Sequence, residues 1–296
     1  RYGSITPRVR ARLQREFRLI NKHQLAGFFL VYYEVVQIAR EVMIELGLSN
    51  SEIALEERPP GRGRGSSVVM LVGYLLGLSH IDPLKFDLSL ERFISDDMTG
   101  VPDIDLAFPR NIREKLIERV HERYGWDHAA LTGMIPTYRF KSVVRDLGKV
   151  LNIPEEDVDR LVKKSDVSRS SKVEGEMLSL PEFRNKIDSP VWRDLIEMAR
   201  QLDGFPKYLA QHPGGMVIAS FPLTNLVPVQ PSAVDGRYVM QWDKDSVGDA
   251  NMVKIDFLAL GALSQMQECL QLIEKRTQKY IDLSRINFDD QHVYES

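Results

Sequence analysis

The strongest constraint on the fold is the segment 101–108, where apolar and acidic residues alternate. Alternation is the period of a β-strand, so Asp103 and Asp105 are expected on one face, while Ile104 and Leu106 point into a core. Two carboxylates on one face repel each other, and Mg²⁺ relieves that repulsion because it prefers oxygen ligands. A strand with this Asp-x-Asp pattern therefore suits two-metal phosphoryl transfer. A solvated strand face or a turn is the competing interpretation of so short a motif.

The composition is typical of a globular protein that has no disulfide bonds and no membrane-spanning segment. Of the 296 residues, 43% are hydrophobic and 27% are charged, which suits one large domain or two modest ones. Cys269 is the only cysteine, which excludes a disulfide framework or a cysteine zinc site and fits a reducing compartment. No apolar run has the length of a membrane span. The net charge of -3 does not indicate nucleic-acid binding, although a local basic surface is compatible with it.

The two ends of the sequence carry no sign of a natural start or stop. The chain begins at Arg1 without Met and shows no signal-peptide pattern, and it ends at Ser296 without a terminating feature. We therefore expect a fragment of a longer protein.

Two helices are predicted near the N-terminus. Residues 7–20 contain five arginines and have apolar residues at helical spacing, which indicates an amphipathic helix with a basic face. Solvation is the favoured explanation of that face, and phosphate contact is the alternative. Residues 28–46 are apolar on almost every side, so this second helix is expected to be buried.

A glycine-rich segment, residues 59–67, precedes the apolar run 68–78. Such a segment, ending in serine and opening a helix, can present free backbone N–H groups to a phosphate. Arg62 and Arg64 would add charge, and arginine suits bidentate phosphate contact. The segment is not a Walker A loop, because the Gly-Lys-Ser/Thr ending is absent. A flexible loop with a capping serine is an equally good interpretation.

Helical periodicity then dominates the chain, with helices expected at 111–124, 137–151, 154–165, 181–187 and 190–203. The part from about 136 to 206 is thus an all-helical insert. Its first helix carries Arg139, Lys141 and Arg145 on one side. These charges either grip a DNA backbone or form a solvated face, and the sequence favours neither.

After residue 206 the pattern changes from that of helices to that of turns and short strands. Residues 211–215 read as a turn and 216–219 as a short strand, with His212 either catalytic or, as we favour, ordering the turn. Asp235-Gly236 between two apolar runs predicts a β-hairpin.

The last predicted strand, residues 252–258, brings a further carboxylate. Its alternation places Lys254 and Asp256 on the face opposite the core. From Ser264 onward the pattern is helical and then becomes polar.

In this order the pieces resemble the C-family of bacterial DNA polymerases, the α subunit of DNA polymerase III, and are nearer to the error-prone subtype than to the main replicase. The resemblance covers nearly the whole chain, and its segments run in the order of the family. They are Gly63-Arg64-Gly65-Ser66, Asp82-Pro83-Leu84, Glu91-Arg92-Phe93, Pro102-Asp103-Ile104-Asp105, Val144-Arg145-Asp146-Leu147-Gly148-Lys149, Gln211-His212-Pro213-Gly214-Gly215-Met216-Val217-Ile218, Gln241-Trp242-Asp243-Lys244-Asp245 and Lys254-Ile255-Asp256-Phe257-Leu258.

The resemblance implies an α+β fold, with a palm of the polymerase-β nucleotidyltransferase type and an inserted all-helical thumb. The palm would comprise 1–135 and 206–261, the thumb 136–205, and the start of the fingers 262–296. The PHP domain and nearly all of the fingers would lie outside this chain.

The resemblance also implies residue roles. Asp103, Asp105 and Asp256 would be catalytic and would hold two Mg²⁺ ions. Gly65 and Ser66 match the loop that contacts the triphosphate, to which Arg64 adds charge, and Lys254 matches a basic residue beside the metals. Apart from the resemblance, the charges of the helical insert give the hypothesis that residues such as Arg139, Lys141 and Arg145 contact the backbone of duplex DNA.

The implied reaction is template-directed DNA synthesis, by nucleotidyl transfer from a dNTP to a primer 3′-hydroxyl. The expected partners are primer–template DNA and dNTP and, in the full-length protein, a sliding clamp and other replisome or repair subunits, in the cytoplasm at the nucleoid. No membrane partner is expected. The isolated chain is expected to be inactive.

The chain departs from the family at three places: Ala107 replaces the third Asp of the Pro-Asp-x-Asp-x-Asp pattern, residues 67–70 replace smaller ones, and Ala259 replaces a glycine. Two alternatives stay open. One is another metal-dependent phosphoryl enzyme, such as a nuclease or a nucleotidyltransferase without template, which would share the carboxylates. The other is a catalytically silent DNA-binding fragment or degenerate paralogue, which Ala107 and the altered loop after Ser66 support.

Overall fold

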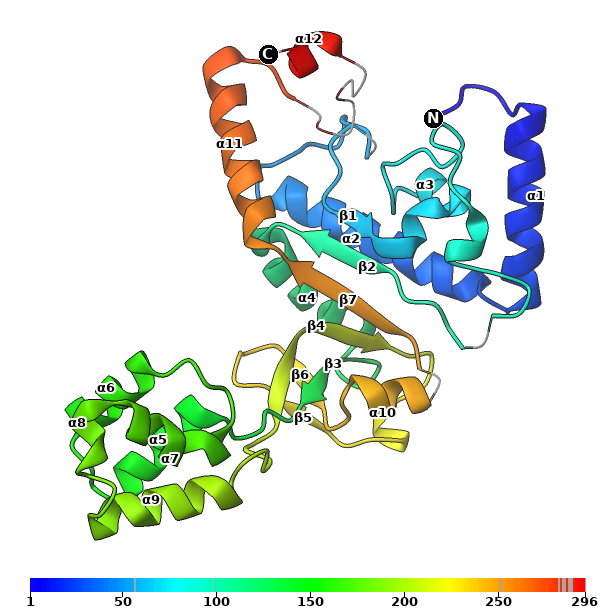
Figure 1. The fold of residues 1–296 in the computed structure, drawn as a ribbon. Coiled ribbons are helices and arrows are strands. Elements are labelled where there is room, and N and C mark those ends of the chain that lie inside the picture. The colour runs from blue at the N-terminus through cyan, green and yellow to red at the C-terminus, as the bar shows by residue number, and fades with distance from the viewer. Residues whose placement is uncertain are drawn as a thin grey trace. The chain divides into compact units, whose positions relative to one another are not determined.

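The computed structural model describes residues 1–55, 57–98, 100–250, 252–281, 283, 286 and 290–295. The chain forms two compact units, one from Arg1–Gly133 with Gln211–Ser296 and the other from Met134–Ala210 (Figure 1). Helices and a mixed sheet are both present, so the predicted α+β class is confirmed as far as the kinds of secondary structure are concerned. Within the described residues, no helix combines the length and the apolar character that crossing a membrane requires.

The first unit is built on a sheet of seven strands in the described part of the chain, in the order β1-β2-β7-β4-β3-β6-β5. Strands β2 and β7 are parallel, and β1–β2 and β4–β7 are antiparallel pairs. Segments far apart in the sequence therefore lie side by side (Figure 1). The strands are β1 Arg62–Arg64, β2 Asp105–Phe108, β3 Ala129–Met134, β4 Ala210–Ile218, β5 Val229–Pro231, β6 Tyr238–Met240 and β7 Lys254–Ala259.

Helices α2 and α4 form the core with one face of this sheet. The predicted burial of the second helix is only partly correct, because Leu30 of α2 is 64% exposed. Tyr32 and Val35 of the same helix are completely buried. They share one apolar cluster with Leu106 of β2 and Phe257 of β7. The helices of this unit are α1 Pro7–Lys22, α2 Ala26–Glu45, α3 Leu71–Leu75, α4 Arg110–Tyr124, α10 Lys244–Asp249, α11 Gly261–Thr277 and α12 Gln291–Glu295, with 3₁₀ turns η1 Gly65–Val69, η2 Leu90–Arg92 and η4 Leu223–Asn225.

The basic face of α1 is exposed, and acidic residues of the segment 87–96 pair with it. Arg8 pairs with Asp87, Arg15 with Glu91, and both Arg18 and Lys22 with Asp96. Solvation, the favoured explanation of this basic face, therefore accounts for only part of it. Acidic residues of a neighbouring segment also neutralise the arginines, and the sequence of the helix alone does not reveal these ion pairs.

The second unit has a separate helical core. Phe140, Leu161, Phe183 and Leu195 are fully buried in it. The helix α7 was not predicted, because its seven residues bury only Val173 and Met177, too short a pattern to recognise. The elements are α5 Phe140–Val150, α6 Glu155–Lys164, η3 Ser170–Lys172, α7 Val173–Ser179, α8 Pro181–Arg184 and α9 Pro190–Gln201.

Two local predictions are corrected. The turn predicted at 211–215 is wrong, because these residues belong to the strand β4, in which Gly215 pairs with Asp256. The strand predicted from residue 101 begins only at Asp105, so Asp103 precedes it. The hairpin at Asp235-Gly236 is confirmed by the antiparallel pairing of β5 and β6.

Candidate metal centre

Four neighbouring strands place one residue each in a single row across the sheet. Arg64 of β1 pairs with Asp105 of β2, Asp105 pairs with Asp256 of β7, and Asp256 pairs with Gly215 of β4. Directly paired residues project from the same face of a sheet. The apolar neighbour Phe257 is buried on the other face, so the acidic row lies opposite the helical core.

Asp103 joins this row from the segment just before β2. Oxygen atoms of Asp103, Asp105 and Asp256 all lie within 4.8 Å of one another. Asp103 is exposed, Asp105 is half-buried and Asp256 is only 8% exposed, so the cluster is open to solvent on the Asp103 side. The structure thus brings together the three carboxylates that the sequence singled out.

The cluster carries excess negative charge. Asp103 is exposed, but the protein groups around its carboxyl displace water and raise its pKa to about 6, with Asp256 and Asp105 adding to the rise and Lys254 opposing it. The Lys254 ammonium pairs with Oδ2 of Asp256, which leaves two carboxylates without a cationic partner of their own in this cluster.

The donor set fits a divalent cation that prefers oxygen ligands. Oδ1 of Asp256 is buried and has no hydrogen-bond partner among the residues that the structure describes. A buried, unpaired carboxylate oxygen is costly unless a cation or a donor meets it. Three carboxylates without sulfur or imidazole ligands match the hard cations rather than zinc.

His212 orders the backbone next to Asp256. Its Nδ1 accepts the N–H groups of Gly214 at 3.2 Å and Gly215 at 2.6 Å, which requires a lone pair on Nδ1 and leaves the proton of the neutral ring on Nε2. Burial lowers the pKa of His212 and favours this neutral form. The favoured interpretation, that His212 orders the chain, therefore agrees with the hydrogen bonds.

Gly215 is required by close packing. A Cβ atom at this position would lie 2.6 Å from Oγ1 of Thr132, 2.9 Å from Nδ1 of His212 and 3.2 Å from Oδ1 of Asp256. Neither Thr132 nor this role of Gly215 was predicted, because only the pairing of β4 with β7 reveals them.

The glycine-rich segment begins beside the carboxylates. Arg64 and Ser66 are exposed, and Gly65 has a φ of +69°, a left-handed conformation that suits glycine. Ser67 points inward and donates its hydroxyl to the Arg64 carbonyl at 2.8 Å. The exposed groups at the start of this loop are thus the side chains of Arg64 and Ser66.

A buried carboxylate that the sequence analysis missed holds the segment after this loop. Glu16 of α1 is completely buried and accepts the N–H groups of Leu71 and Val72, each at 2.8 Å. Arg12 pairs with Glu16 at 2.8 Å and donates to the carbonyl of Val69 at 2.7 Å. The i,i+4 spacing of Arg12 and Glu16 was the only available signal.

Ala107 stands two residues beyond Asp105 and therefore on the same face of β2. It is 1% exposed and lines a cavity of about 220 Å³ with Pro60, Arg62 and Leu263. A buried methyl group therefore occupies this position beyond Asp105, and no further carboxylate of β2 joins the cluster.

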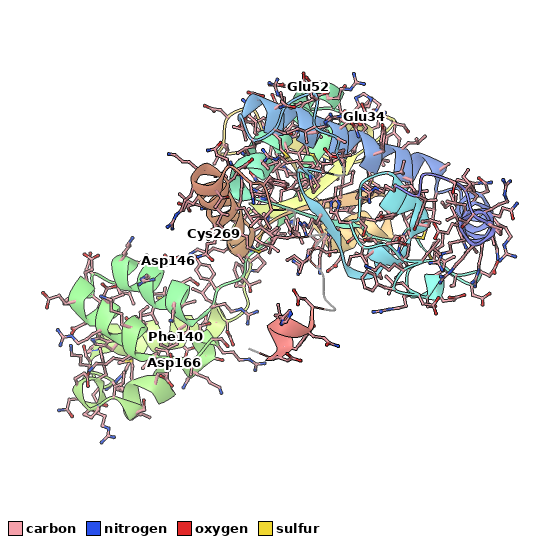
Figure 2. All side chains as sticks on the ribbon, turned by 90° about the horizontal axis from the view of Figure 1, so that it is seen from above. Glu34, Glu52, Phe140, Asp146, Asp166 and Cys269 are labelled. Atoms are coloured by element: carbon pink, nitrogen blue, oxygen red, sulfur yellow. The ribbon has the colours of Figure 1, made fainter. Side chains whose placement is uncertain are left out.

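The predicted DNA contacts lie in the second unit. Arg139, Lys141 and Arg145 are exposed near or on α5, whose Phe140 is buried among the helices (Figure 2). Arg145 lies 3.6 Å from Asp159. For Arg139 and Lys141, no ion-pair partner occurs in the described ranges, so both charges are available.

Comparisons with known proteins agree with these observations. Residues 1–259 match the family model described as the bacterial DNA polymerase III alpha NTPase domain. The chain is 35% identical over 284 residues to an error-prone DNA polymerase of Vibrio parahaemolyticus, covering 95% of this chain and 26% of that protein. It is 36% identical over 292 residues to one of Bordetella parapertussis, covering 98% of this chain and 26% of the relative. The chain thus spans about a quarter of the length of the curated relatives it matches.

Proposed function

Because the chain belongs to the bacterial DNA polymerase III alpha family, we propose that its first unit holds the catalytic centre of template-directed DNA synthesis, with nucleotidyl transfer from a dNTP to a primer 3′-hydroxyl. The observation that carries this proposal is the convergence of Asp103, Asp105 and Asp256 within 4.8 Å on the open face of the sheet. The error-prone polymerases that resemble this chain are much longer, and their activity is transferred to it only as part of this proposal.

Asp103, Asp105 and Asp256 would hold two Mg²⁺ ions. When bound, these ions would acidify the primer hydroxyl and neutralise the triphosphate and the leaving pyrophosphate. The chain itself orients the carboxylates: the β2–β7 pairing fixes Asp105 beside Asp256, and Lys254 holds one oxygen of Asp256.

The groups that would meet the triphosphate lie on both sides of the carboxylates. Arg64 is registered with Asp105, and Gly65 and Ser66 follow it in the exposed loop. Lys254 lies beside Asp256 on β7, the strand next to β2. Positive charge and exposed donors at this place would neutralise phosphate oxygens and orient them for in-line attack.

The two units would correspond to palm and thumb. We assign the palm to 1–135 and 206–261, a helical thumb to 136–205 and the start of the fingers to 262–296. The limits of the helical unit, Met134–Ala210, support the assignment because they fall within a few residues of these boundaries.

Arg139, Lys141 and Arg145 of the helical unit would contact the phosphate backbone of primer–template DNA. Their exposure supports this role. Such contacts position DNA without reading its sequence. In the full-length protein the partners would include a sliding clamp and other replisome or repair subunits, at the nucleoid of the cytoplasm.

Metal binding and primer extension test the proposal. Calorimetry should show Mn²⁺ binding to the chain, strongly weakened in Asp105→Asn and unchanged in Asp97→Asn, an exposed acid outside the cluster. The full-length parent should extend a primer only with template, and Asp103→Ala should abolish extension. Extension without template would indicate a different phosphoryl enzyme, and absence of Mn²⁺ binding would indicate a silent DNA-binding fragment.

The chain alone is expected to extend a primer poorly. The fingers would supply much of the grip on the triphosphate, and loss of preorganised donors costs on the order of 10²–10³ in rate for each donor. Robust extension by the chain, abolished in the Asp103→Ala variant, would contradict this expectation.

A further inference from the structure

Tyr32 connects the buried helix α2 to the segment that carries two of the carboxylates. Its side chain is completely buried, and its hydroxyl oxygen accepts the N–H of Ile104 at 3.3 Å. Ile104 stands between Asp103 and Asp105 and precedes β2, whose pairing begins at Asp105. The hydrogen bond therefore fixes the peptide between the two carboxylates, at a place that the pairing of the strands does not reach.

The hydroxyl of Tyr32 also lies in the electrostatic field of the cluster. Burial raises the pKa of Tyr32 well above its ordinary value, and the charges of Asp103, Asp256 and Asp105 raise it further. The phenol is therefore protonated, and its oxygen accepts the N–H of Ile104.

The packing of the Tyr32 ring does not explain why the side chain carries a hydroxyl group. The ring lies 4.8 Å from that of Phe28, between ring centroids, in the main apolar cluster. A phenylalanine would fill this space equally well, and phenylalanines occupy positions 28 and 29 on the same helix. A hydroxyl in an otherwise apolar core is stabilised only by the polar groups that it meets, and here the group it meets is the peptide of the metal-binding segment.

We propose that Tyr32 is a positioning residue of the metal centre, which holds the Asp103–Asp105 segment through the N–H of Ile104 so that both carboxylates engage a cation together. This inference rests on the proposed metal role of Asp103, Asp105 and Asp256. Tyr32 touches neither substrate nor metal, and it acts through the peptide that it binds.

The test is the Tyr32→Phe change, which removes one oxygen atom and keeps the ring. Partners of metal ligands typically contribute tenfold or more to metal affinity, so Mn²⁺ should bind on the order of tenfold more weakly to the variant in calorimetry. Tyr33→Phe is the matched control, because the neighbouring Tyr33 is 41% exposed and should leave Mn²⁺ affinity unchanged. In the full-length parent, Tyr32→Phe should lower kcat and leave the KM for dNTP nearly unchanged.

A second measurement begins with the wild-type chain, so that its deciding result does not depend on how well a variant folds. In ¹H–¹⁵N spectra of the wild-type chain, the amide hydrogen of Ile104 should exchange slowly, and its resonance should shift in Tyr32→Phe but not in Tyr33→Phe. Rapid exchange of this amide in the wild-type chain would overturn the proposal.

The outcomes separate this inference from the function on which it rests. If Asp105→Asn loses Mn²⁺ while Tyr32→Phe binds it as the wild type does, the role of Tyr32 is overturned and the metal centre stands. If the wild-type chain binds no Mn²⁺, the metal centre is overturned and the role of Tyr32 with it.

Discussion

Gly215 illustrates how a residue without a side chain determines where a carboxylate lies. A Cβ atom here would approach Thr132, His212 and Asp256 too closely. Gly215→Ala should therefore displace Asp256 or His212 and cost about 1–3 kcal/mol of stability, as overpacked cores do. Urea unfolding and Mn²⁺ titration measure the two effects.

Gly248→Ala is the matched control for this change. Gly248 lies in α10 and has no atom within 4 Å of the position of a Cβ atom, so alanine should be tolerated or slightly stabilising. Equal unfolding midpoints for the two variants would contradict the packing argument at Gly215.

The buried His121 should make the free energy of unfolding depend on pH. Burial lowers its pKa from 6.5 to about 4 in the folded chain, so the unfolded chain binds the proton more tightly. The contribution to stability is complete above pH 6.5 and is lost as the pH falls toward 4, by about 2–3 kcal/mol.

Urea unfolding at pH 7 and at pH 4.5 measures this loss. His121→Leu should show a smaller decrease in stability between the two pH values than the wild type. His128→Leu, a change at a half-buried histidine, controls for the loss of an imidazole. Identical pH dependence in the wild type and in His121→Leu would refute the argument.

At the scale of secondary structure, Glu16 attaches α1 to the segment after the glycine-rich segment. Removing one partner of a buried ion pair leaves the other charge uncompensated, typically at a cost of about 3–5 kcal/mol. Glu16→Gln should therefore unfold at a clearly lower urea concentration, because Arg12 loses its partner. Glu91→Gln, which breaks the surface pair with Arg15, should unfold as the wild type does. Similar midpoints for the two variants would show that Glu16 does not hold α1 to this segment.

The sequence predicted most elements of the fold because their patterns are local. The helices α1, α2 and α4 follow from apolar spacing, and the β5–β6 hairpin follows from Asp235-Gly236. The strand order could not be predicted, because it depends on pairing between distant segments: Arg64 with Asp105 and Gly215 with Asp256 are 41 residues apart, and Asp105 with Asp256 are 151 apart.

Because only local patterns can be recognised in a sequence, some residues of the candidate site were predicted and others were not. Asp103, Asp105 and Asp256 stand out because carboxylates are unusual in segments with the alternating pattern of a strand. Tyr32 and Glu16 do not, because a tyrosine in an apolar helix suggests packing and a glutamate in a basic helix suggests a surface pair. Their roles depend on the backbone N–H groups that they meet in the fold.

At the scale of the whole molecule, the proposed DNA contacts predict a salt dependence. Each phosphate contact adds about -0.9 to the slope of log affinity against log salt, because bound cations are released from DNA. Lys141→Ala should reduce the steepness of that slope by about one unit. Lys163→Ala should change it less, because Lys163 lies 3.4 Å from Asp159. Binding that does not respond to salt would rule out the assignment.

The helical unit closes on itself where the chain enters and leaves it. Thr137 and Pro206 form a β-bridge between these two ends. The backbone N–H of Tyr138 donates to the carbonyl of Phe205, and that of Lys207 donates to the carbonyl of Pro136, each at 2.9 Å. The unit is inserted between β3 and β4, which are neighbours in the sheet. The helical unit is therefore an insertion whose length can change during evolution while the order and pairing of the strands that carry the carboxylates stay the same. For the same reason, a protein engineer can replace it with a short turn between β3 and β4.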